Sequence, residues 1–399
     1  SIIIQTYIFE YDIFGQKVAD ALLKKAGAGI IIEILIDYLG SFHFPKELKA
    51  EFEQTKGIHF YFFNPVKFKK LLQMGRRLHH KILLIDNKQA MLGGININDY
   101  SEPPCPDHPR LDFAILLSGE IVNHLTTYCS CVLSPIVKKV LTTKKIKQIT
   151  RKEDNISLKI NDWFRDRKQI TSSYMNLITN AKQEILLIHG YFFPSFRILR
   201  NLKKKARQGL RVTLILPKHS DWQTWVWASN YLYYNLIREN ISIMEWEQSN
   251  LHGKLALFDN KIVTLGSHNL NYTSSYGNLE LNIEIHNKEF VQSIKKDFIK
   301  NIIAGSRGIT ADEFLSQGLL KKIRNAFFSY ALLVISSFSI SIIKFSRRVN
   351  EMSLLSLIMM LLLFFIGLVG IILPILPGFP FLLAAIALYM KKGSTLKNK

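Results

Sequence analysis

The chain has 399 residues, and its 48% hydrophobic content and mean hydropathy of +0.10 are high for a purely soluble enzyme. The formal net charge of +21 implies a partner with negative charge, either a nucleic-acid backbone or an anionic lipid surface, and charge alone does not choose between them. The three cysteines, Cys105, Cys129 and Cys131, support neither a disulfide framework nor a zinc site.

The first predicted element is an apolar strand that begins at Ile2 and leads to an aromatic triplet, Tyr7 to Phe9. A lysine-rich helical stretch follows, and Gly29 suits its C-cap because glycine readily adopts the left-handed conformation. A second strand, Ile30 to Ile36, comes next. Since the apolar run starts directly after Ser1, we expect that the N-terminus is truncated.

The first half then carries a short polar motif on a strand. His79 and Lys81 are two residues apart, so both project from one face of the strand, and His80 points away from it. A following apolar run buries the strand. Asp86 ends the run. We count it with the catalytic motif, although its position also suits a carboxylate that stabilises a turn. A turn at glycine then brings Asn96 back to the same edge.

A basic connector is predicted over residues 134–168, as a surface linker that could face lipid. After it, the order of elements from the first half returns: Tyr191 to Phe193, a lysine-rich stretch, Gly209 and a strand from Leu210 to Leu216. Alternating strands and helices are typical of an α/β sandwich. The fold class is therefore α/β, with two similar halves, residues 1–133 and 169–305.

The polar motif also returns, at one constant offset. His252 and Lys254 match the first pair, Asp259 matches the turn carboxylate, and Asn269, accompanied by Ser267, comes back to the same edge. Two complete copies in register indicate that the halves pack around one shared active site, where the asparagines and the serine would bind substrate.

Together the copies supply two imidazoles, two ammonium groups and two carboxamides, which suits phosphodiester cleavage without a metal or a cofactor. One neutral histidine would attack phosphorus, while the other, protonated, would give its proton to the leaving alkoxide. The two histidines need opposite protonation states, and hence orienting partners. Asp112 and Glu280 lie at matching distances downstream and are the candidates; plain strand-end carboxylates are the alternative.

Between the second strand and the second motif lies a cluster of aromatic residues. It is interpreted either as the lining of an acyl-chain groove or membrane interface, or as ordinary core packing of a helix. Its members are Trp222, Trp225, Trp227, Tyr231, Tyr233 and Tyr234.

Two apolar stretches close the chain. The first, Ala326 to Ile343, has cations on both sides, which favours a helix in the membrane interface within a basic region, residues 306–349. The second, Leu354 to Met390, holds one span of about 20 residues, a Pro-Gly break and a shorter return. We therefore predict a transmembrane hairpin over residues 350–399, with the cations at its two ends on the cytoplasmic side.

The paired motifs resemble the signature of the phospholipase D superfamily: His-x-Lys, four residues, Asp, six residues, then Gly-(Gly/Ser)-x-Asn. The likeness covers about residues 1–305. Within the superfamily the chain is most similar to bacterial cardiolipin synthases, on the segments Tyr7 to Asp12, Arg76-Arg77, Gly93 to Asn96 and Asn278 to Glu280. Asp221 matches an acidic position of similar synthases, where it would contact the head group.

This resemblance implies a phosphatidyl transferase that works through a phosphohistidine. His79 would attack one phosphatidylglycerol, release glycerol and pass the phosphatidyl group to a second molecule, which gives cardiolipin. The resemblance also implies that the carboxylates are exchanged between the halves. Glu280 would then support His79, and Asp112 would support His252. The expected location is the bacterial inner membrane, with the catalytic part in the cytoplasm.

Three other functions stay open. A hydrolytic phospholipase D, or transfer to another alcohol, would use the same residues and differ only in the acceptor. A nuclease suits the charge, but the hairpin and the aromatic cluster count against it, so no nucleic-acid partner is expected. A noncatalytic membrane scaffold conflicts with two complete motifs. Anionic phospholipid and membrane are the expected partners, and the oligomeric state is unknown.

Overall fold

The computed structural model describes residues 1–66, 76–99, 110–137 and 155–351, with residues 356, 358–360 and 362–363 beyond them. Residues Ser1–Ser336 form one compact unit, and the chain from Ser337 onward forms a second. Both predicted halves lie in the first unit, so contacts between them are part of one body.

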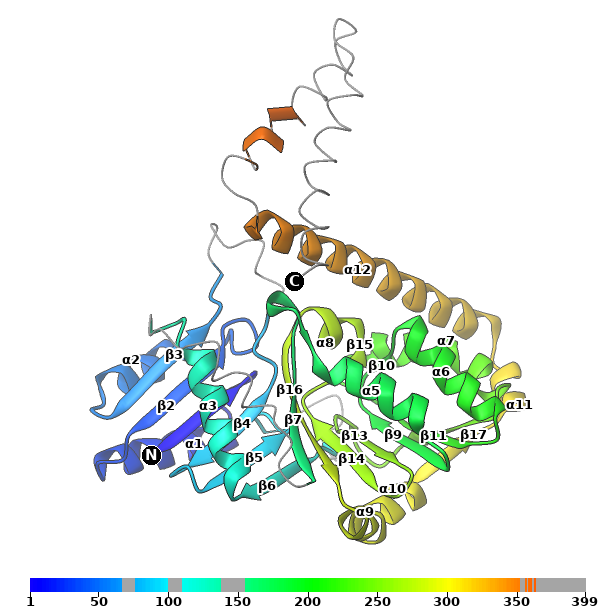
Figure 1. The fold of residues 1–399 in the computed structure, drawn as a ribbon, viewed down its shortest axis with the longest axis horizontal. Helices are drawn as coiled ribbons and strands as arrows, with labels where there is room; N and C mark the ends of the chain where they lie inside the picture. The colour runs from blue at the N-terminus through cyan, green and yellow to red at the C-terminus, as the bar shows by residue number, and fades with distance from the viewer. Residues whose placement is uncertain are drawn as a thin grey trace, which may run out of the picture. The chain divides into compact units, whose positions relative to one another are not determined.

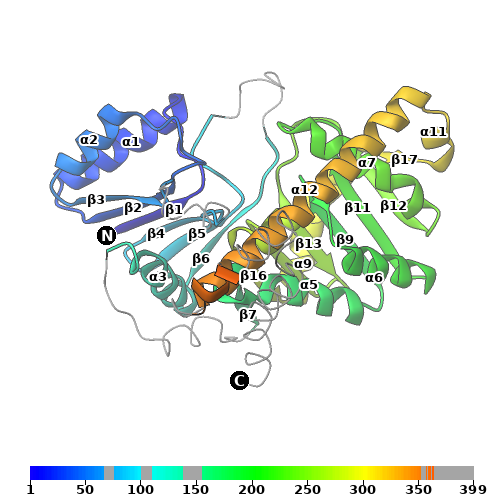
Figure 2. The ribbon, with the colours of Figure 1, turned by 90° about the horizontal axis from the view of Figure 1, so that it is seen from above.

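The first half is a six-stranded mixed sheet (Figure 1), in the order β3-β2-β1-β4-β5-β6. Figure 2 shows α1 and α2 on one face of this sheet and α3 on the other. Isoleucine-rich strands suit such a doubly covered sheet. The elements are β1 (Ile2–Thr6), α1 (Ile13–Gly27), β2 (Ile32–Asp37), α2 (Lys46–Gln54), β3 (Ile58–Phe63), β4 (Lys81–Ile85), β5 (Gln89–Gly93), β6 (Ala114–Ser118) and α3 (Glu120–Leu133).

The second half contains a nine-stranded sheet in the order β17-β12-β11-β9-β13-β14-β16-β7-β8. Its first elements are β7 (Ile156–Asp162), the short helix η2 (Trp163–Arg165), β8 (Arg167–Lys168), α5 (Gln169–Asn180), β9 (Glu184–His189), β10 (Phe192–Phe193), α6 (Phe196–Arg207), β11 (Arg211–Pro217) and α7 (Gln223–Ile237).

The remaining elements complete this sheet and lead out of it. They are β12 (Ile241–Trp246), β13 (Lys254–Phe258), β14 (Ile262–Gly266), β15 (Leu270–Asn271), α8 (Tyr272–Tyr276), β16 (Leu279–His286), α9 (Lys288–Ile294), the π-helix η3 (Lys295–Ile299), α10 (Lys300–Ala304), β17 (Ser306–Ile309), α11 (Ala311–Leu315) and α12 (Leu319–Glu351).

The two sheets share one strand order. Strands β12, β11, β9, β13, β14 and β16 of the second half correspond in sequence to β3, β2, β1, β4, β5 and β6 of the first. In both, the three strands before the motif strand are parallel and the three from the motif strand onward are antiparallel. The prediction of two similar α/β halves therefore agrees with the sheet topology.

The connector is shorter than the sequence predicts. Residues 138–154 lie outside the described residues, but Ile156–Asp162 is strand β7, which pairs antiparallel with β16. Leu158 and Ile160 are fully buried while Lys159 between them is only partly so. The flanking basic residues conceal this alternation in the sequence, although it is the ordinary pattern of a strand.

One hydrophobic core holds the two halves together. Leu84 and Leu92 of the first sheet belong to the same buried cluster as Leu265 and Leu281 of the second. The helices α1 and α2 cover a separate cluster on the outer face of the first sheet, and α5, α6 and α7 contribute to another in the second half. Because the central cluster is continuous, the edges that carry the motifs are fixed against each other.

The predicted interfacial stretch, Ala326 to Ile343, is part of the long helix α12. Among the residues that the structure describes, no helix is both long and apolar enough to cross a membrane. The hairpin predicted over residues 350–399 falls almost entirely outside the described residues, so it stays a prediction.

Candidate active site

The first histidine lies just before its motif strand, where the chain meets the other half. Leu78 forms a β-bridge with Leu279, and the His79 amide donates to the Leu279 carbonyl oxygen over 3.0 Å. Glu280 follows Leu279, so the bridge sets its carboxylate beside the imidazole. The distance from His79 Nδ1 to Glu280 Oε2 is 2.9 Å.

The second histidine has the same arrangement with the halves exchanged: His252 of the second half meets a carboxylate of the first half. Leu251 forms a β-bridge with Leu111, and the His252 amide donates to the Leu111 carbonyl oxygen over 2.9 Å. Asp112 follows Leu111, and its Oδ2 lies 2.6 Å from His252 Nδ1. Each imidazole is thus paired with the carboxylate of the other half, as the family resemblance implies.

The two carboxylates are held in different ways. A Cβ on Gly94 would lie 2.1 Å from Asp112 Oδ1, so only glycine leaves room for that carboxylate. Ser267, at the matching position, donates from Oγ to Glu280 Oε2 over 2.5 Å, and Asn278 Nδ2 donates to Glu280 Oε1 over 3.2 Å. Ser267 is fully buried and does not line the cleft. It positions Glu280, whereas the sequence predicted a contact with substrate.

Both motif lysines are buried beside the histidines. Lys81 Nζ donates to the His79 carbonyl oxygen over 2.5 Å, and Lys254 Nζ lies 2.9 Å from His252 Nε2. Burial, together with the nearby Lys254 ammonium, lowers the pKa of Lys81 to about 7. Burial also lowers the pKa of Lys254 to about 8. Because an anionic phosphate would favour both charged forms, the pair is suited to bind one.

Burial favours the neutral form of both histidines. Burial lowers the pKa of His79, and the Glu280 carboxylate opposes this shift. Burial lowers the pKa of His252 to about 3, and Lys254 adds to the effect. Burial alone would raise the pKa of both Asp112 and Glu280, but their histidine partners outweigh it, and both carboxyls have lowered pKa values. A neutral imidazole held by an ionised carboxylate can act as a nucleophile.

One cleft of about 310 Å³ joins the two motifs, because His79, His252, Asn96 and Asn269 all line it. Asn96 Oδ1 accepts from the Ile8 amide over 3.3 Å, which leaves its Nδ2 to donate into the cleft. The described residues contain no group of three or more His, Cys, Asp and Glu side chains that could hold a metal ion. Arg77 and Arg110 line the cleft, and Lys81 and Lys254 are buried beside its histidines.

The motif aspartates lie away from this cleft, at the far ends of β4 and β13. Each aspartate directly follows the five-residue strand that its lysine begins, which puts it about 16 Å from that lysine along the strand. Asp259 accepts hydrogen bonds from three successive amides, those of residues 182–184, whereas the Asp86 carboxylate is largely exposed. Both stand at left-handed φ values of +52°. They lie in turns, and this position supports a structural role rather than the catalytic role predicted from the sequence.

Several cleft residues were not predicted. The Tyr7 ring packs edge-on against His79 at 5.0 Å between centroids, and the Tyr191 ring packs against His252 at 5.9 Å. Each tyrosine is the first residue of the aromatic triplet that occurs in both halves, and this repeat in the sequence could have indicated a role at the site. Arg110 also lines the cleft and pairs with Asp221 of the other half at 3.0 Å, a contact that no local pattern indicates.

The aromatic cluster is divided between the catalytic cleft, the protein core and the contact with α12. Trp222 and Trp225 line the cleft, and 64% of Trp222 is exposed. Tyr233 is buried in the core under α7, whereas Trp227 packs on Phe328 of α12 at 4.9 Å. His80, which points away from the cleft, contacts Gln5 and Tyr128.

Two α/β halves that bring their histidines to one cleft, each with a lysine buried beside it, define a phosphodiester-transferring enzyme of the phospholipase D type. The family profile described as "Cardiolipin synthase, PLD-like domain" matches residues 1–108 and 174–302. The chain belongs to this family, and it is a phosphatidyltransferase of the cardiolipin synthase type.

Two cardiolipin synthases are similar to this chain in sequence, and one solved structure shares its fold. Cardiolipin synthase B from Escherichia coli K12 is 30% identical over 312 residues, which cover 76% of this chain and 74% of that protein. A cardiolipin synthase from Clostridium perfringens is 27% identical over 79% of this chain and 68% of its own length. The solved phosphatidylserine synthase of Haemophilus influenzae superposes with a TM-score of 0.64 at 15% identity, covering 84% of this chain and 89% of that one.

Proposed function

We propose that the protein joins two phosphatidylglycerol molecules into cardiolipin and releases glycerol, through a phosphohistidine on His79. The observation that carries this is the pair of cross-half contacts, His79 with Glu280 and His252 with Asp112, at the edge of one cleft. Each contact uses Nδ1, so Nε2 is the ring atom directed to chemistry.

The first step breaks the bond between phosphorus and the glycerol oxygen. His79 Nε2 attacks phosphorus as its new bond forms, and the departing glycerol alkoxide takes the proton of His252. The bound anionic phosphate raises the pKa of His252, so His252 takes up a proton from water before the step and can then donate it. Lys81 and Lys254, with the Asn96 amide, neutralise the charge that grows on the nonbridging oxygens.

The second step reverses the roles. A hydroxyl of a second phosphatidylglycerol gives its proton to His252 and attacks phosphorus, which breaks the bond to His79 and frees cardiolipin. The test is to incubate the purified full-length protein in detergent with phosphatidylglycerol and to quantify products. We expect cardiolipin and glycerol in equal amounts. Phosphatidic acid in place of cardiolipin would identify a hydrolase, and cleavage of DNA offered separately would identify a nuclease.

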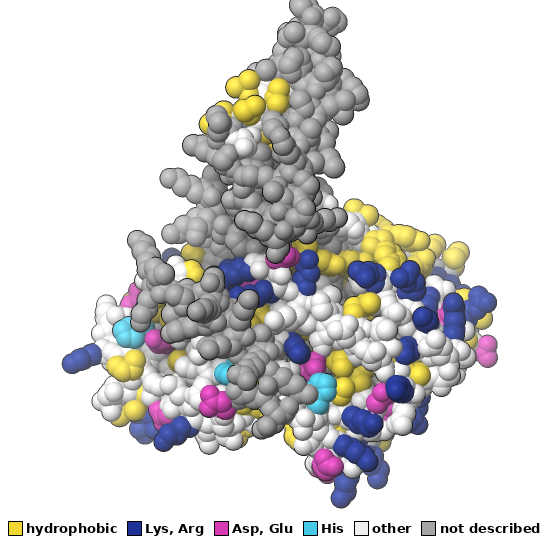
Figure 3. Space-filling model, viewed as in Figure 1, with side chains coloured by type: hydrophobic (Ala, Val, Ile, Leu, Met, Phe, Trp, Pro, Cys, Tyr) yellow, Lys and Arg dark blue, Asp and Glu magenta, His cyan; other side chains and the backbone are white. Residues whose placement is uncertain are grey.

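Membrane contact through α12 is the second part of this proposal. Its exposed apolar side chains recur at helical spacing along one face, at Leu320, Ile323, Phe327, Tyr330 and Val334, which are between 55% and 84% exposed. Figure 3 shows hydrophobic side chains over α12, with lysines and arginines beside them. An apolar stripe next to cations suits an anionic membrane surface, and we place that surface on the cytoplasmic face of a bacterial inner membrane.

A further inference from the structure

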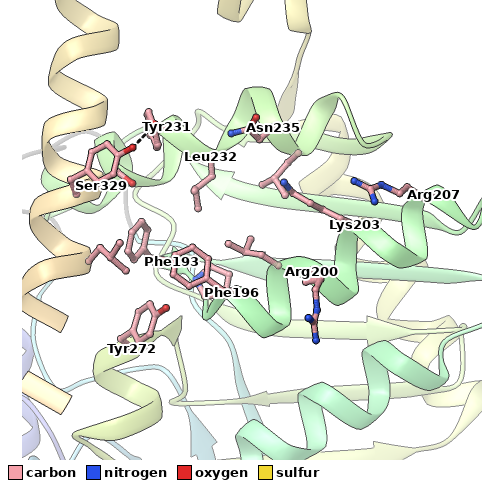
Figure 4. A pocket seen from close by; sticks show the side chains of 15 residues that line it. Phe193, Phe196, Arg200, Lys203, Arg207, Tyr231, Leu232, Asn235, Tyr272 and Ser329 are labelled. Atoms are coloured by element: carbon pink, nitrogen blue, oxygen red, sulfur yellow. Dashed lines mark hydrogen bonds between the residues drawn. The ribbon is translucent and has the colours of Figure 1, made fainter. Parts of the chain in front are cut away.

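A second cavity, of about 650 Å³, lies between α6, α7 and α12 in the first compact unit (Figure 4). It shares no lining residue with the catalytic cleft. Its walls are mainly apolar and include Phe193, Leu199, Leu232 and Leu333. Its volume is within the range of about 300–1,000 Å³ that is usual for small-molecule sites.

Cations of α6 form one side of this cavity. Arg200, Lys203 and Arg207 follow one another at helical spacing, so they share a face, and Figure 4 shows them along one side of the pocket. Arg207 forms an ion pair with Glu239. Within the described part of the chain, no hydrogen bond or ion pair engages the side chains of Arg200 and Lys203. The Glu239 carboxylate is paired with Arg207, and Lys203 lies near enough to lower its pKa, so one carboxylate stands against the three cations of this side of the cavity.

Apolar walls beside cations suit a ligand that has both a hydrocarbon chain and an anionic group. The guanidinium of Arg200 can bind two oxygens of a phosphate and the Lys203 ammonium a third, while the apolar walls exclude water from a hydrocarbon chain. We propose that the cavity is a second, noncatalytic binding site for one anionic phospholipid. Its acyl chain lies against Phe193, Leu232 and Leu333, and its phosphate lies between Arg200 and Lys203.

The place of the cavity supports a lipid rather than a soluble phosphate. Tyr330 and Leu333 of α12 line it, and Tyr330 also belongs to the exposed apolar stripe of that helix. A lipid could therefore enter from the surface that α12 presents. The phosphate of the reacting lipid uses other cations, Lys81 and Lys254, so this site does not depend on the transfer reaction.

Photolabelling of the full-length protein in detergent tests the assignment. The probe is phosphatidylglycerol with a diazirine at the end of one acyl chain, used on the His79→Ala variant so that it is not consumed. We expect labelled peptides that contain Phe193, Leu232 or Leu333. The double variant Arg200→Ala/Lys203→Ala should reduce this label about tenfold or more, because two charge-assisted contacts are lost.

The matched control is Arg197→Ala/Lys204→Ala, which removes two charges from the same helix at exposed positions outside the cavity. It should retain the label, whereas equal loss in both double variants would show general charge attraction and overturn the proposal. Asn235→Trp, at an exposed position on the lining, should block the label without altering charge. Circular dichroism checks that each variant is folded.

Two further arms separate the possible ligands. A diazirine probe built on phosphatidylcholine should label the cavity less than the phosphatidylglycerol probe, because its headgroup has no net charge. Unlabelled phosphatidylglycerol should compete with the probe, and inorganic phosphate at the same concentration should not. Competition by inorganic phosphate alone, or labels that fall only outside the cavity, would overturn the assignment of a lipid site.

Discussion

At the scale of single residues, the two halves are similar in sequence but not equivalent in chemistry. Ser267 donates to Glu280, whereas the matching Gly94 only makes room for Asp112. His79 therefore has a carboxylate held by extra donors, while Lys254 lies next to His252. This asymmetry, together with the family resemblance, supports different roles for the two imidazoles, His79 as nucleophile and His252 as proton carrier.

The histidine roles predict different defects. His79→Ala and His252→Ala should each lower cardiolipin formation by about a thousandfold or more, since each removes a group that the reaction requires. Only the His252 variant should accumulate phosphohistidine, because its nucleophile is intact. Peptide mass spectrometry under alkaline conditions locates the phosphate, and a phosphate on His252 in the His79 variant would reverse the assignment.

The lysines predict an alkaline limit to activity. The pKa of Lys81 is lowered to about 7 and that of Lys254 to about 8, so both ammonium groups lose their protons as the pH rises through this window. The kcat/KM for phosphatidylglycerol, which reports the free enzyme, should fall across it. For kcat the fall should come at higher pH, because bound phosphate favours the charged lysines. A kcat/KM that is flat from pH 7 to 9 would contradict this reading.

At the scale of elements, the strands β4 and β13 each begin at a motif lysine beside the active site and are followed by a motif aspartate that lies in a turn. The lysine is buried beside the histidine of its motif, while the aspartate five residues later sits in a left-handed turn. The turn of Asp259 is held more firmly than that of Asp86, because the Asp259 carboxylate accepts hydrogen bonds from three amides just before and at the start of β9. The spacing of the motif thus reflects the length of one strand.

The anchoring of this turn predicts an effect on stability alone. Asp259→Ala leaves three amides without their acceptor, and it should lower the free energy of unfolding by about 1–3 kcal/mol. Denaturant titration measures this, and kcat per folded molecule should stay within about twofold of the parent. Asp86→Ala is the matched control, with a smaller loss because the Asp86 carboxylate is largely exposed to water. A large fall in kcat for Asp259→Ala would return this aspartate to the catalytic group.

At the scale of the whole molecule, the site exists only because the halves share a core. The β-bridges Leu78–Leu279 and Leu111–Leu251 cross between them, and the ion pair of Arg76 with Asp162 joins them again at 2.6 Å. The same body offers the membrane an apolar stripe on α12 beside basic side chains.

Membrane attachment gives the last prediction. A chain without residues 350–399 keeps the stripe of α12 and the basic surface, so it should bind anionic vesicles at low salt. Raising the salt should release it, because screening weakens the charge attraction and the apolar helix alone gives limited affinity. The full-length chain should resist salt and require detergent, as vesicle sedimentation will measure. Release of the full-length chain by salt alone would show that Leu354 to Met390 is not inserted.

The sequence by itself determined the repeated α/β halves and the residues that face the cleft. Strand periodicity sets His79 with Lys81 and His252 with Lys254 on one face, and the constant offset between the copies predicts a common place for Asn96 and Asn269. These features are local, because they depend on the alternation of neighbouring side chains.

Only the tertiary structure decided which groups support the histidines and what lies around them. Glu280 is 201 residues from His79 and Asp112 is 140 from His252, and only the family resemblance suggested the exchange between halves. The buried role of Ser267, the strand β7 within the basic connector and the cavity beside α6 likewise depend on contacts between distant segments. Such contacts arise from the packing of one half on the other, which no periodicity within a single strand or helix encodes.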